Sequence, residues 1–109
     1  MSKPIRKFYD SITVSSGNGS LTTSADKYRP MTYAGGYIKQ IIVTAPSPTD
    51  TFDFVIIDSD GLPIFRRKEA TGEIVEERDL PVLGVLTLQI TNAITDGNYL
   101  IGIKLKEEW

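Results

Sequence analysis

The stretch FDFVIIDSDGLPIF, from Phe52 to Phe65, decides the fold, because it joins two hydrophobic runs through a turn rich in aspartate. Side chains alternate between the two faces of a β-strand, so Phe52, Phe54 and Ile56 share one face and Asp53 lies on the other. Glycine tolerates the positive φ that tight hairpin turns require, and Asp60-Gly61 supplies it at the bend. The stretch therefore predicts a β-hairpin that buries one face.

The aspartates of DSDG also raise the question of a cation site. An EF-hand loop requires an oxygen ligand at its fifth position and a glycine at its sixth. Counted from Asp58, Leu62 is fifth and Gly61 is fourth, so the register fails. A turn is the favoured interpretation, and a weak site of two carboxylates is the alternative. The second Asp-Gly pair, Asp96-Gly97, favours the turn.

Other segments show the same alternation and predict further strands. One face of each is apolar in residues 8–14, 85–92 and 98–106, and the expected core residues are Phe8, Ile12, Val14, Leu86, Leu88, Ile90, Tyr99, Ile101, Ile103 and Leu105. Residues 37–46 read as a strong strand, residues 62–70 as the return strand of the hairpin, and residues 71–81 as a turn with a short charged edge segment. Seven to eight short antiparallel strands predict an all-β fold, a single β-sandwich or jelly-roll-like domain.

The chain reads as one domain over residues 1–109, divided by composition. Residues 1–35 are basic and rich in loops, and we expect an extended N-terminal arm and edge region there. Within it, residues 15–26 read as a loop or hairpin tip, and residues 28–36, which contain Pro30, as an edge strand or extended arm. Residues 36–106 form the predicted sandwich core. Arms of this kind pack on a neighbouring protein.

Composition excludes several classes of function. The 109 residues contain no Cys and no His, which rules out Ser–His–Asp and Cys–His catalysis and makes a zinc site untenable. No apolar run is long enough to span a membrane. The N-terminal residues lack the apolar region of a signal peptide, so we expect synthesis in the cytoplasm without export. We expect no cofactor, no metal, no membrane partner and no enzyme activity.

Charge is unevenly distributed along the chain. The net charge is −2, so the chain as a whole lacks the basic charge that is typical of nucleic-acid-binding proteins. The only basic run, Arg66–Lys68, is followed at once by Glu69. Residues 1–46 carry six basic and two acidic side chains, a net charge of +4, whereas residues 47–109 carry six basic and twelve acidic ones, a net charge of −6. Either this is a mixed solvated surface, or positive and negative faces meet between neighbouring copies.

Paired carboxylates and aromatic residues are the remaining candidates for a site. Glu76-Glu77 and Glu107-Glu108 are not ready-made acid–base pairs, because adjacent residues of a strand point to opposite faces, so we interpret them as charged edges. The aromatic residues either belong to the core and its rim or form a sugar-stacking platform, whose members would be Tyr28, Tyr33, Tyr37, Tyr99 and Trp109. We expect a protein interface that includes Arg6, Phe8, Tyr9, Tyr33, Tyr37 and Trp109.

One family resemblance covers about residues 35–105. The runs GGYIKQIIVTAPSPTDTFDFVIIDSDGLPIF and TGEIVEERDLPVLGVLTLQITNAITDGNYLIGIKL resemble small all-β proteins encoded among the structural genes of tailed bacteriophages. The matched positions are strand and turn residues, so no functional residue carries over. The resemblance implies a virion structural protein located in the virion, with the major capsid protein or another virion protein as partner and with homo-oligomers.

Three classes of function follow in order of preference. The first is a capsid decoration (cement) protein, with a head–tail or tail accessory protein close behind. The second is a carbohydrate-binding or adhesin module, and the third, with least support, is a small enzyme.

Overall fold

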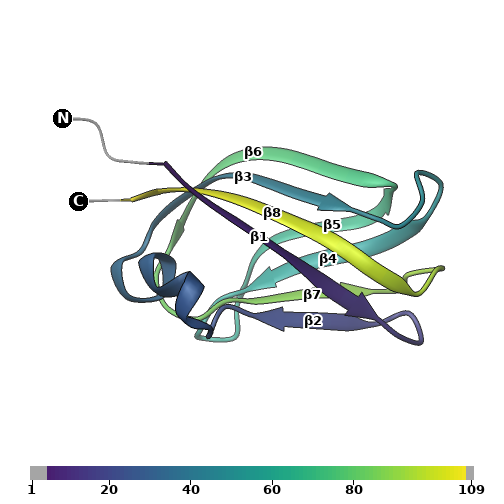
Figure 1. Ribbon diagram of the computed structural model, residues 1–109, viewed down its shortest axis with the longest axis horizontal. Helices are drawn as coiled ribbons and strands as arrows, with labels where there is room; N and C mark the ends of the chain where they lie inside the picture. Colours follow the sequence, from purple (N-terminus) through teal and green to yellow (C-terminus); the bar gives the residue numbers. More distant parts are fainter. Residues whose placement is uncertain (1–4, 108–109) are drawn as a thin grey trace.

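The computed structural model describes residues 5–107, apart from the side chain of Ala34. Eight β-strands and two short helical turns make up this part of the chain (Figure 1). The strands are β1 (Ile5–Val14), β2 (Gly19–Thr22), β3 (Gly36–Thr44), β4 (Thr51–Ile57), β5 (Pro63–Thr71), β6 (Glu73–Val82), β7 (Thr87–Thr91) and β8 (Gly97–Glu107). The helical turns are η1 (Asp26–Tyr28), a 3-10 helix, and η2 (Pro30–Ala34), a π-helical turn.

The strands form two four-stranded antiparallel sheets, ordered β1-β8-β3-β6 and β2-β7-β4-β5. The pairings β1–β8, β2–β7, β3–β6 and β4–β5 show that the chain folds as one long antiparallel ribbon, its first half against its second. The further pairings β3–β8 and β4–β7 bring successive turns of the ribbon together, which is the winding of a jelly roll. The predicted all-β sandwich of jelly-roll type is confirmed.

The core lies between the two sheets and follows the predicted alternation. Phe52, Phe54 and Ile56 of β4 are buried, and Phe52 meets Tyr99 of the opposite sheet edge-on, with ring centroids 5.2 Å apart. The other residues predicted for the core are buried as well: Phe8, Ile12, Val14, Leu86, Leu88, Ile90, Tyr99, Ile101, Ile103 and Leu105.

The prediction of an extended N-terminal arm is wrong for the described residues. β1 is a full strand of the sheet and pairs with β8 over ten residues, from Ile5 opposite Lys106 to Val14 opposite Gly97. The physical reason is the alternation of Phe8, Ile12 and Val14, which can be buried only if the segment joins a sheet. Residues 15–22 are likewise ordered, as a turn at Ser15–Asn18 followed by the short strand β2.

The segment around Pro30 is also not the expected edge strand or extended arm. Pro30 is the first residue of η2, a position where its missing N–H costs no hydrogen bond. Gly35, with φ of +75°, ends the turn, and its N–H donates to the carbonyl of Pro30 at 3.0 Å. Residues 26–34 therefore form a compact bridge between the two sheets and bury Tyr28 and Met31.

The β4–β5 hairpin, from Phe52 to Phe65, provides a test of the core. Phe54 is buried and its neighbour Val55 lies on the outer face of the sheet. We expect Phe54→Ala to lower the free energy of unfolding by about 3–5 kcal/mol, because it leaves a cavity. The matched control Val55→Ala should cost less than about 1 kcal/mol. Urea denaturation measures both, and equal losses would contradict the assigned strand faces.

Candidate interaction surfaces

The structure separates the residues predicted for one interface. The prediction that Phe8 belongs to the interface is wrong, because its ring is buried against Tyr28, with the ring centroids 5.5 Å apart. Arg6 lies on β1 and forms an ion pair with Glu107 at the end of β8. Tyr9 is 69% exposed on the outer face of the β1-β8-β3-β6 sheet, whereas Tyr33 is 72% exposed on η2. Trp109 lies outside the described residues.

Tyr37 is half-buried at the start of β3, opposite Lys106 of β8 and Pro81 of β6. It therefore belongs to the same outer face as Tyr9, several residues further along the sheet. The predicted set thus contributes to two surfaces: an outer sheet face that carries Tyr9 and Tyr37, and an end of the sandwich that carries Tyr33.

We call that end the loop end and define it by η2, the β4–β5 loop (residues 58–62) and the β6–β7 loop (residues 83–86). Figure 1 shows the helical turns at the same end of the sandwich as the start of β1 and the end of β8. The β6–β7 loop contacts both of the other segments: the N–H of Gly84 donates to the carbonyl of Thr32 at 3.0 Å, and Gly84 packs beside Ser59. The loop end is therefore one continuous structure, although its parts are far apart in sequence.

Each segment of the loop end exposes one large apolar side chain. These are Tyr33 of η2, Leu62 of the β4–β5 loop and Leu83 of the β6–β7 loop, with exposed fractions of 72%, 61% and 63%. The guanidinium of Arg29 stacks on the Tyr33 ring, 4.9 Å from its centroid. Sequence reasoning missed both leucines, although each stands beside a glycine in a turn, where an apolar residue has no core to enter.

The DSDG turn gives the loop end its shape, and the predicted turn is confirmed. One carboxylate oxygen of Asp58 accepts hydrogen bonds from the N–H groups of Asp60, at 3.0 Å, and Leu62, at 2.9 Å. Gly61 takes a φ of +83°. The carboxylate of Asp58 is thus used by the backbone of its own loop, and residues 5–107 hold no group of three acidic side chains suited to a metal ion.

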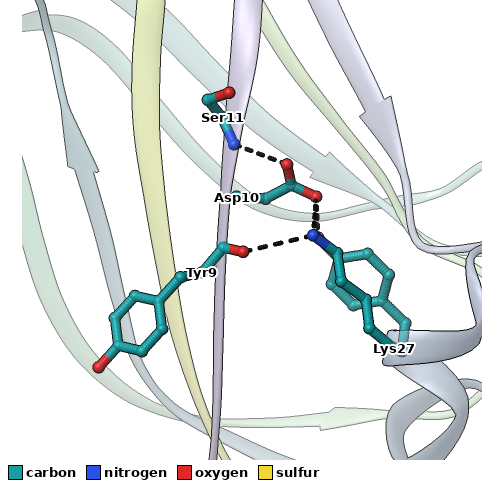
Figure 2. A network of polar contacts seen from close by, with 5 residues as sticks. Tyr9, Asp10, Ser11 and Lys27 are labelled. Atoms are coloured by element: carbon teal, nitrogen blue, oxygen red, sulfur yellow. Dashed lines mark hydrogen bonds and ion pairs between the residues drawn. The ribbon is translucent and has the colours of Figure 1, made fainter.

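A polar network fixes the helical turns to β1 (Figure 2). The carboxylate of Asp10 accepts hydrogen bonds from the Tyr28 hydroxyl at 2.5 Å and from the Ser11 N–H at 2.8 Å. The Lys27 ammonium lies 2.9 Å from the same carboxylate and also donates to the Tyr9 carbonyl at 3.4 Å. The bridge that carries Tyr33 is therefore held to the sheet by both packing and charge.

Partial burial pulls the pKa of Asp10 upward, but the hydrogen bonds from Lys27, Tyr28 and Ser11 outweigh it and hold the pKa below its usual range. Burial, with the neighbouring charge of Asp10, raises the pKa of Tyr28 far above its ordinary value. The Tyr28 hydroxyl consequently stays protonated and remains a hydrogen-bond donor. Neither group is poised as an acid or base near neutral pH.

Glu76, singled out from the sequence, and the nearby Asp79 are engaged with basic side chains. Glu76 accepts from Arg67 at 2.6 Å and lies 3.6 Å from Arg78. Asp79 pairs with Lys39. Glu77 instead points to the outer face of the sheet, as its pairing with Gln40 requires, so the two adjacent glutamates diverge as expected.

The predicted sugar-stacking platform is wrong for two of its members, because Tyr28 and Tyr99 are buried. A polar depression of about 330 Å³ does lie on the outer face of the other sheet, lined by Asp53, Arg66, Lys68, Gln89, Thr91 and Asn92 among others. The carboxylate of Asp53 in this depression already accepts hydrogen bonds from the Glu69 N–H and the Asn92 side-chain amide, both at 2.8 Å. These hydrogen bonds hold the pKa of Asp53 below its usual range. The depression offers hydrogen-bonding groups but no exposed aromatic ring of the described chain.

No family model matches the chain, and no curated protein matches it with significant similarity. Within residues 5–107, no helix has the length and apolar character that crossing a membrane requires. The likeness of residues 35–105 to phage structural proteins accordingly stays a prediction.

The Asp10 network predicts a pH-dependent stability. The pKa of Asp10 is lower in the folded than in the unfolded chain, where it is 3.8, so its stabilisation is complete above that value and is lost as the pH falls through the folded pKa. We expect Asp10→Asn to lower the free energy of unfolding by about 1–2 kcal/mol at pH 7.

The same difference in the free energy of unfolding should shrink as the pH falls through the folded pKa of Asp10, because the carboxyl is then protonated in both the folded and the unfolded chain. Urea denaturation of both proteins across this range measures it. A difference that does not change with pH would show that the carboxylate charge plays no part.

Proposed function

We propose that the protein is a non-enzymatic structural protein of a virion, a capsid decoration protein that binds the head of a tailed bacteriophage and stabilises it. The loop end makes the contact with the capsid. One observation carries the choice of this surface: Tyr33, Leu62 and Leu83 are each exposed on a segment of the loop end, where the β6–β7 loop contacts the other two segments. Large apolar side chains gathered on a protein surface mark sites of interaction.

The chemistry of the loop end suits a protein partner. Interface hot spots are enriched in tyrosine and arginine, which Tyr33 and Arg29 supply as a stacked pair. Leucines beside them add apolar area without charge. No basic cluster of the kind that binds phosphate backbones surrounds them on the described loops, so a protein surface is the favoured partner.

The loop end is also rigid before any partner arrives. The DSDG turn is closed by the Asp58 carboxylate, the β6–β7 loop is bonded to Thr32, and η1 is anchored to Asp10. Side chains and loops that are already ordered lose less entropy on binding, so a modest surface can yield useful affinity. Rigidity of this kind serves a protein whose task is to reinforce a particle.

The jelly-roll fold supports the proposal by analogy alone, because this fold occurs in viral capsid proteins and also in lectins. The assignment to a phage head rests on the resemblance of residues 35–105. A head–tail or tail accessory protein would use the same loop end on a different virion partner. A sugar-binding module would use the polar depression around Asp53 instead.

Co-sedimentation with expanded heads of a phage whose genome carries this coding sequence tests the proposal. We expect saturable binding of the full chain. The double variant Tyr33→Ser/Leu83→Ser should bind at least about 30-fold more weakly, since hot-spot residues contribute about 2 kcal/mol or more.

The matched control is Ile94→Ser, which removes a side chain of similar exposure, 68%, from the opposite end of the sandwich. It should bind heads as the unaltered protein does. Failure of the unaltered protein to bind heads, together with binding to necks, tails or a glycan array, would replace the proposed function by the corresponding alternative.

A further inference from the structure

The outer face of the β1-β8-β3-β6 sheet carries an apolar row that crosses all four strands. Tyr9 of β1 lies opposite Gly102 of β8, Gly102 lies opposite Ile42 of β3, and Ile42 lies opposite Val75 of β6. Tyr9 and Val75 are 69% and 51% exposed, and Leu100, in the neighbouring row, is 58% exposed. Most outward positions of a solvated sheet are polar, so an exposed apolar row of this kind indicates a surface that contacts another molecule.

Gly102 makes the row uneven. A Cβ atom added there would lie 3.7 Å from Ile42 and 3.8 Å from the Tyr9 ring, with no closer contact. The glycine is thus a low position between Ile42 and the Tyr9 ring, with room for a methyl-sized group. Neither the backbone nor close packing explains why the position lacks a side chain, because Gly102 has no positive φ.

The next row of the same face is positively charged at its β1–β8 side and negatively charged at its β6 side. Lys7 and Lys104 lie opposite each other on β1 and β8, and the row continues through Gln40 to Glu77 on β6. Glu73 lies on the same side as Glu77, two rows away. Among the ion pairs within the described residues, none includes these four charged side chains.

We infer that this face binds a second copy of the same chain, through a two-fold axis that runs parallel to the strands between the two sheets. Such an axis lays β1 over β6 of the second copy and β8 over its β3. Tyr9 then meets Val75, Ile42 enters the gap at Gly102, and Lys7 meets Glu77, each contact occurring twice. The same surface is its own complement.

The alternative symmetric arrangement is disfavoured by charge. A two-fold axis perpendicular to the strands, through the apolar row, lays β6 on β6 and sets Glu77 over Glu73 of the second copy. Like charges facing each other across an interface are destabilising, so the register selects the axis parallel to the strands. Packed sheets lie about 10 Å apart, which lysine and glutamate side chains can bridge.

A depression of about 450 Å³ adjoins the charged row and is lined by Lys39, Gln40, Glu77 and Lys104 among others. In the inferred dimer, Lys104 of the second copy lies over Gln40 and enters this depression, close to Glu77. Since Lys39, Arg78 and Lys104 line the depression together with Glu77 and Asp79, it supports the arrangement by its shape and not by its charge. The inference concerns a different surface from the loop end, so its failure would leave the proposed head contact untouched.

Sedimentation velocity of the full chain over a series of concentrations tests the inference. We expect a monomer–dimer equilibrium that weakens with added salt. Gly102→Glu should raise the dissociation constant at least about 30-fold, because it fills the gap with a charge at the centre of the contact. A Cβ atom added at Gly102 makes only ordinary contacts in the monomer and the position faces outward, so the fold should survive, as circular dichroism would verify.

The matched control is Gln89→Glu, which adds a carboxylate at a half-buried outward position in a central strand of the other sheet. It should leave the dimer unchanged. A strict monomer at every concentration, a closed oligomer of odd number, or a dimer that Gly102→Glu leaves intact would overturn the inference.

Charge exchange tests the orientation of the two copies. Lys7→Glu and Glu77→Lys should each weaken the dimer, because each sets like charges against one another. An equimolar mixture of the two variants should recover it as a heterodimer with both pairs restored. Two variants that dimerise alone as well as they do together would contradict the axis parallel to the strands.

Discussion

The pairing of the first strand with the last is the constraint on which the rest of the structure depends. β1 and β8 are hydrogen-bonded over ten residues, and β8 pairs with β3 on its other edge. This closes the ribbon into a jelly roll and buries Phe8, Ile12 and Val14 against the opposite sheet. Because the side-chain period of a strand is two, a slip of one residue would expose all three.

Both proposed surfaces depend on this pairing. It sets Tyr9 beside Gly102 and Lys7 beside Lys104, which produces the apolar row and the basic side of the outer face. It also places Asp10 where the Tyr28 hydroxyl and Lys27 can reach it, and so fixes the bridge that leads to Tyr33. A loop end built on this anchor keeps its shape without a partner.

Local alternation made the strands and the core predictable, because burial of Phe52, Phe54 and Ile56 needs only the period of the strand. The Pro30 segment was not predictable in this way, since Pro30 fits both an edge strand and the first position of a helical turn. Phe8 was assigned to both the core and the interface, and burial decides for the core.

The surfaces depend on contacts that the sequence does not display. The row from Tyr9 to Val75 combines strands about 65 residues apart, and its register becomes visible only once β8 lies between β1 and β3. The loop end likewise joins three segments, and the leucines of two of them look incidental in sequence. The uneven charge along the chain did not predict the charged sides of the outer face, because pairing sets Lys104, from the acidic half of the chain, beside Lys7.

Carbodiimide cross-linking of an equal mixture of isotope-labelled and unlabelled protein tests the central claim most directly. Within one chain, Lys7 and Glu77 are separated by three strand spacings, about 14 Å, which is too far for a direct amide bond. The inferred two-fold axis predicts a Lys7–Glu77 link that joins labelled to unlabelled peptides. Dimers in which this link is absent, or in which links join the β1 lysines to the β1 region of the second copy, would contradict it.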